Sequence, residues 1–130
     1  MERLKERLQV ARKALTTLQE LTSKSNLSVI ERDAAIQRFE YTFEATWKAA
    51  QMFLNEFEGL NANSPKSTVR ACWQVGIFDE EHAQKALQMC ETRNMTVHTY
   101  NETLAVSVYR EISVYAVLLD LWLQEMDKKT

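Results

Sequence analysis

Arg93, His98 and Tyr100 are the residues of this chain whose types and spacing could do chemistry. They lie together in the segment RNMTVHTYNE, with the histidine five residues after the arginine and the tyrosine two residues later. An arginine offers a planar charged fork to phosphate oxygens, and a histidine can accept or release a proton near neutral pH. The segment could therefore bind a phosphate group and move a proton beside it.

The position of this segment supports that interpretation, because it comes just before the expected start of a helix. Asn101 is a good N-terminal cap, and the free backbone amides at a helix N-terminus attract anions. The spacing Arg-x4-His is a weak signal by itself, since it occurs by chance in many proteins. On spacing alone, a structural histidine with satisfied hydrogen bonds is an open alternative for His98.

Other polar residues are expected to have structural roles. His82 lies in DEEH at an expected helix start, where capping is favoured over a metal site because contiguous helical residues point in different directions. Glu40 and Glu44 are one turn apart and predict a solvated or salt-bridged face. Arg32 and Arg38 could line a cleft, although the sequence does not orient them.

The elements that must position these residues are predicted to be helices. The chain has 130 residues with only two glycines and one proline, whereas sheets and barrels need frequent turn residues. Hydrophobic residues make up 45% and charged residues 26% of the chain, which is typical of a globular protein. We therefore expect an all-α fold of about five helices, forming a single domain over residues 1–130.

The first two helices are predicted by apolar periodicity and capping signals. Apolar residues at spacings of three and four indicate a first helix over about residues 2–22. A capping box of Ser28 and Glu31 begins a second helix, which should run to about Phe57 before Gly59 stops it. The aromatic residues of its stripe are expected in the core: Phe39, Phe43 and Trp47.

Three further signals divide the rest of the chain. Ser64 and Pro65 begin a short third helix, and Gly76 marks its end. Asp79 can cap a fourth helix over about 80–92, so that RNMTVHTY connects it to a last helix over about 102–126. The final residues, MDKKT, are expected to be frayed and solvated.

The last helix is apolar around so much of its surface that it should need a second partner. Five residues widen its main apolar stripe: Val106, Tyr109, Val117, Leu118 and Leu121. That partner could be the rest of the core or a neighbouring subunit. Because exposed apolar patches tend to mark interfaces, we expect a homodimer.

Several classes of protein are poorly supported. A net charge of −2 argues against broad coating of nucleic acid but allows a small basic cleft. Cys72 and Cys90 are isolated, which indicates two reduced thiols in a cytoplasmic protein and no zinc site. No signal peptide is visible, and the most apolar run, ISVYAVLLDLWL, is too short to span a membrane. Without a P-loop, a dinucleotide motif or a G-x-S-x-G elbow, nucleotide hydrolysis, dinucleotide binding and esterase chemistry are poorly supported, and we expect no cofactor.

Three segments together resemble a known family. RNMTVHTYNE resembles the R-N-x-x-x-H-x-Y segment of HEPN-domain proteins of the HepT type, also described as nucleotidyltransferase substrate-binding proteins. RDAAIQRFEYTFEATWKAA is similar to the long second helix of that family, and SPKSTVRACWQVGIFDE is similar to the short helix and turn that follow. The segments occur in family order and cover most of the chain after about residue 28.

This resemblance implies an antiparallel bundle that dimerises, with two copies of the motif facing a shared cleft. Arg93 and His98 would be the catalytic pair of a metal-independent endoribonuclease, and Asn94 would orient the pair by hydrogen bonding. The 2′-hydroxyl of the RNA would be the nucleophile. Tyr100 would be the tyrosine that a minimal nucleotidyltransferase antitoxin adenylylates in order to silence the toxin.

Two other functions stay open. The same resemblance supports a noncatalytic substrate-binding subunit, which would assemble with a separate catalytic nucleotidyltransferase polypeptide. A purely structural helical dimer is the third interpretation. It explains less, because the polar motif residues gather beside a helix start and not on an apolar stripe.

Overall fold

A computed structural model describes residues 2–130, and within this range the chain forms helices and no strand. The α-helices are α1 (Glu2–Thr22), α2 (Val29–Glu58), α3 (Pro65–Gln74), α4 (Glu80–Met95) and α5 (Glu102–Lys129). A short 3₁₀ helix, η1 (Thr96–His98), lies between α4 and α5. The predicted all-α bundle of about five helices is confirmed.

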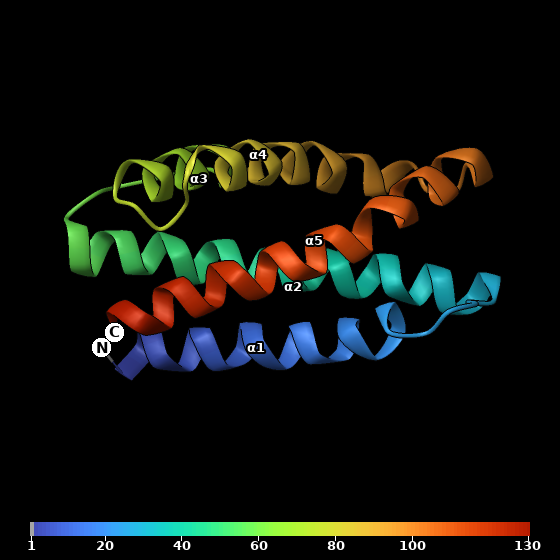
Figure 1. Cartoon of the computed structure of the whole chain (residues 1–130), viewed down its shortest axis with the longest axis horizontal. Coiled ribbons are helices and arrows are strands. Elements are labelled where there is room, and N and C mark those ends of the chain that lie inside the picture. The colour runs from blue at the N-terminus through green and yellow to red at the C-terminus, as the bar shows by residue number, and fades with distance from the viewer. Residues whose placement is uncertain (1) are drawn as a thin grey trace.

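The helices form an elongated antiparallel bundle (Figure 1). α1 and α2 pack side by side in opposite directions, α5 packs against both, and α3 and α4 lie along the other side of α2. The start of α1 and the end of α5 lie at one end of the bundle, whereas η1 and the starts of α2 and α5 lie at the other (Figure 1). The chain thus carries the RNMTVHTY segment to the end opposite its termini.

The helix boundaries follow from local capping interactions. At the start of α2, the Ser28 hydroxyl accepts from the Glu31 amide at 3.1 Å, and the Glu31 carboxylate accepts from the Ser28 amide at 3.0 Å. Gly59 ends α2 with a φ of 67°, in the left-handed region that favours glycine. The predicted capping box and glycine stop are confirmed.

Two helix ends differ from the prediction. α4 continues to Met95, so Arg93 and Asn94 are helical, and η1 follows in place of an open connection. The extra turn is held by Thr96, whose buried hydroxyl lies 2.8 Å from the Arg93 carbonyl oxygen. α5 reaches Lys129 through residues that were expected to fray, because lysines suit the negative end of a helix.

One continuous cluster of apolar side chains joins the helices. Phe39 and Phe43 are buried as predicted, and Trp47 is partly buried against the cluster. Trp122 of α5 is fully buried, with its ring centroid 5.1 Å from that of Phe78. Burying each large apolar side chain contributes about 1.5–3 kcal/mol, which holds the long helices in fixed positions.

Both cysteines are free and buried. Burial raises the pKa of Cys72 to about 12 and the pKa of Cys90 to about 11, so neither thiol is reactive near neutral pH. Among the described residues, none of the helices combines the length and hydrophobicity that a bilayer crossing requires.

Candidate functional site

Arg93 is held in place by side chains of α2 and η1. Its Nη1 donates to the Thr96 hydroxyl at 3.0 Å and lies 3.4 Å from Oε2 of Glu40. Its Nε lies 3.8 Å from Oε1 of Glu44 and makes no hydrogen bond within residues 2–130. Since Thr96 is 4% exposed and its hydroxyl also lies 2.8 Å from Oε2 of Glu40, the guanidinium is oriented by a mostly enclosed network.

A cavity of about 360 Å³ opens beside this arginine, between α2, α3 and α4. Lys66, in the first turn of α3, lines it and forms an ion pair with Glu91. Asn94 also lines the cavity, is exposed, and hydrogen-bonds to neither Arg93 nor His98 in the described part of the chain. The cavity gives a small anionic group access to the cationic side chains of Arg93 and Lys66.

His98 and Tyr100 lie in the exposed turn after α4. Their ring centroids are 6.1 Å apart with an interplanar angle of 72°, and Tyr100 is 86% exposed. Over residues 2–130, no hydrogen bond or ion pair joins His98 to Arg93. The structure therefore brings His98 and Tyr100 together, while Arg93 faces α2 within the same chain.

An ion pair fixes the start of α5 beside this turn. Arg32 of α2 donates to both carboxylate oxygens of Glu102, at 2.6 and 3.1 Å, and these bonds lower the pKa of Glu102. Asn101 caps α5 by accepting from the Leu104 amide at 3.1 Å, as predicted. Arg32 thus joins α2 to α5 and does not line the cavity beside Arg93.

Arg38 is also used away from that cavity. Its Nη1 donates to the Thr17 carbonyl oxygen at 2.7 Å and lies 3.5 Å from the Glu20 carboxylate. His82 has the capping role that was expected: its amide and its ring Nδ1 both lie 2.8 Å from Oδ1 of Asp79. No group of three or more His, Cys, Asp or Glu residues in 2–130 is arranged to hold a metal ion.

A family model described as nucleotidyltransferase substrate binding protein like matches residues 6–128. The chain belongs to this family. The resemblance to nucleotidyltransferase substrate-binding proteins, drawn above from three segments, is therefore confirmed. The comparison with curated proteins gave no match.

Two solved structures share the fold of this chain. The crystal structure of ttk003001694 from Thermus thermophilus matches with a TM-score of 0.87 and 51% sequence identity, over 89% of this chain and 98% of that one. HI0074 from Haemophilus influenzae matches with a TM-score of 0.77 and 21% identity, over 92% of this chain and 98% of that one. The HI0074 structure is described as revealing the fold of a substrate binding domain of a nucleotidyltransferase.

Sequence reasoning did not identify the residues that position Arg93. Glu40 and Glu44 were expected on a solvated or salt-bridged face, and the structure shows the salt-bridged alternative, with an arginine partner on a different helix. Thr96 was not singled out at all, although its hydroxyl joins Arg93 to Glu40. The available signal was the pair of carboxylates one turn apart, which could hold one guanidinium between them.

Proposed function

We propose that this chain is a HepT-like toxin, a metal-independent endoribonuclease that acts through Arg93 and His98 and is controlled by a nucleotidyltransferase antitoxin. The observation that carries the proposal is the layout of the motif. Arg93 is oriented beside an open cavity, and His98 is exposed on the next turn next to Tyr100. Arg93 thus has the orientation, and His98 and Tyr100 have the exposure, on which the proposed roles rest.

The proposed reaction uses the RNA's own nucleophile. The 2′-oxygen bonds to phosphorus, the bond from phosphorus to the 5′-oxygen breaks, and the products carry a 2′,3′-cyclic phosphate and a 5′-hydroxyl. His98 takes the proton of the 2′-hydroxyl or supplies the proton of the leaving 5′-oxygen. Arg93 stabilises the charge on the nonbridging oxygens, and Asn94 lines the cavity in which the phosphate would lie.

A second copy of the chain is proposed to complete the site, because His98 and Arg93 do not meet within one chain. Val114 and Val117 of α5 are 50% and 72% exposed, and with Leu118 and Leu121 they line a largely apolar cavity of about 280 Å³. We propose that this face is covered in a homodimer. Val117→Asp should then shift the protein to monomer in light scattering, whereas a monomeric wild type would contradict the proposal.

Tyr100 is proposed as the site of silencing. Its phenol is the most exposed large apolar or aromatic side chain of the described residues. In the proposed step, the phenol oxygen attacks the α-phosphorus of ATP on the partner enzyme, pyrophosphate leaves, and the phenol proton is released. The adenylate would then stand beside the His98 ring and block access to it.

A noncatalytic substrate-binding subunit is the second candidate, and one observation favours it. Arg93 already lies near two carboxylates, Glu40 and Glu44, which oppose the approach of a phosphate. HI0074 is described as a substrate binding domain of a nucleotidyltransferase. In this alternative the chain would assemble with a catalytic nucleotidyltransferase, and His98→Ala would leave that complex intact.

Incubation of unmodified protein with varied RNAs in EDTA separates the two candidates. We expect wild type to cleave and to leave cyclic phosphate ends, and we expect His98→Ala to lose turnover while keeping its fold. Equal cleavage by both proteins would indicate a contaminating nuclease. No cleavage by wild type would overturn the ribonuclease in favour of the binding subunit.

A further inference from the structure

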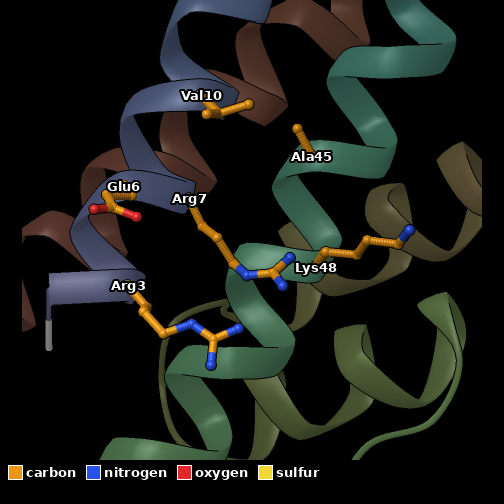
Figure 2. A pocket seen from close by; sticks show the side chains of 6 residues that line it. All are labelled: Arg3, Glu6, Arg7, Val10, Ala45 and Lys48. Carbon is orange, nitrogen blue, oxygen red and sulfur yellow. The ribbon is translucent and has the colours of Figure 1, made fainter.

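A groove between α1 and α2, separate from the cavity beside Arg93, gathers cationic side chains. It consists of two adjoining cavities of about 340 and 390 Å³, which share Arg3, Arg7 and Lys48 as lining residues. Figure 2 shows the guanidinium groups of Arg3 and Arg7 reaching from α1 toward α2, while Lys48 continues in the same direction on α2. The three cationic side chains therefore form a row that runs from α1 across α2 (Figure 2).

The two arginines of this row repel each other. Arg3 and Arg7 are one turn apart near the N-terminus of α1, where like charges repel and the helix dipole opposes cations. Neither arginine forms an ion pair within residues 2–130, and the nearest carboxylate oxygen to Lys48 is that of Glu44 at 4.0 Å. Glu6 also lines the groove, but its carboxylate points away from α2 (Figure 2).

The second cavity adds amide side chains to the cations. Gln51, Asn55, Asn61 and Asn63 line it, together with the carboxylate of Glu56. The Asn55 amide donates to Oδ1 of Asn61 at 2.8 Å, and the Gln51 amide donates to the Ala62 carbonyl oxygen at 2.6 Å. These bonds leave the Asn61 amide nitrogen and the Asn55 and Gln51 amide oxygens able to serve a ligand, and such groups match the edges of nucleobases.

We propose that this groove binds a short stretch of single-stranded RNA, with its phosphates on Arg3, Arg7 and Lys48 and its bases toward the amides. The shape favours a strand over a single nucleotide, because the lining of α2 from Ala45 to Glu56 extends for about 16 Å at 1.5 Å per residue. Val10 and Ala45 supply apolar surface on which a base can rest. The amides match bases, which an acidic peptide lacks.

The groove also lies close to the candidate catalytic site. Glu44 is one helical turn from Lys48, lines the cavity beside Arg93, and lies 3.8 Å from the Arg93 Nε. A strand that leaves the groove past Lys48 therefore reaches the region of Arg93. RNA binding in this groove does not require cleavage by the motif.

The test measures RNA binding with cleavage removed. Full-length His98→Ala protein is titrated in EDTA against a labelled single-stranded RNA of about ten nucleotides, and anisotropy is followed over a range of salt concentrations. Adding Arg3→Gln and Arg7→Gln should weaken binding on the order of tenfold and reduce the slope of log affinity against log salt by about 1.4. Both side chains are exposed, so the fold should survive.

The matched control is Lys5→Gln with Lys13→Gln, which removes the same charge from exposed positions of α1 outside the groove. We expect this control to bind nearly as wild type. An equal loss in both double variants, or no binding by the parent, would overturn the proposal. Stronger competition by ATP than by RNA would assign the groove to a free nucleotide, and competition by polyglutamate of equal charge would assign it to an acidic peptide.

Discussion

The two halves of the RNMTVHTY segment are held very differently. Arg93 lies on α4 and is held by a buried threonine and two carboxylates. His98 and Tyr100 lie instead on an exposed turn, with their ring centroids 6.1 Å apart. The arginine has lost most of its rotamer freedom before any ligand binds, so it adds little entropic cost to binding. His98 keeps its rotamer freedom, so a second copy of the chain or the RNA itself must position it.

The largest effect is expected when the buried Thr96 hydroxyl that holds Arg93 is removed. Thr96→Val keeps the side-chain shape but deprives Glu40 and Arg93 of a hydrogen-bond partner, so the free energy of unfolding should fall by about 1–3 kcal/mol. In the proposed ribonuclease, RNA cleavage should also fall. Urea unfolding followed by circular dichroism measures the first effect.

His98→Ala is the matched change in the exposed half, and it should alter the free energy of unfolding by less than about 0.5 kcal/mol. If His98→Ala destabilises the protein as much as Thr96→Val does, the contrast between the two halves is wrong.

The second prediction compares an exposed tyrosine with a buried one. Tetranitromethane should nitrate Tyr100 roughly tenfold faster than Tyr115, because burial raises the pKa of Tyr115 and disfavours the reactive phenolate. Peptide mass spectrometry locates the modified residue, and Tyr100→Phe should remove the fast phase. Equal rates at Tyr100 and Tyr115 would mean that the turn around Tyr100 is covered in solution, for example by a second copy.

The third and smallest effect concerns the ion pair that fixes the start of α5 next to the turn. Hydrogen bonds from Arg32 lower the pKa of Glu102, so the stability that Glu102 contributes is present at neutral pH and is lost as the pH falls through that lowered pKa. Wild type should therefore be slightly more stable than Glu102→Gln at neutral pH. The gap should close in acid, below the ordinary range of a glutamate.

Urea titrations of both proteins at a series of pH values check this. Other acid-sensitive groups, such as Glu31 with its pKa of about 2, are common to both proteins and cancel in the difference. A gap that stays constant with pH would show that Glu102 acts through packing and not through its charge.

Local sequence was sufficient for the helices and their starts. The capping signals at Ser28, Ser64, Asp79 and Asn101 each predict a cap that the structure contains. Caps and amphipathic periods join residues only three or four apart, so their physics is complete within a short window of sequence. The same locality explains why the aromatic residues of α2 were placed correctly in the core.

The surroundings of Arg93 depended on tertiary packing. Its two carboxylate partners lie on α2, about fifty residues earlier in the chain, and the extra turn of α4 rests on the burial of Thr96 against that helix. The row of Arg3, Arg7 and Lys48 likewise exists only because α1 and α2 pack side by side. The sequence identifies the charged groups. Their ion-pair partners and the strength of their electrostatic interactions depend on distances that are set when the helices pack.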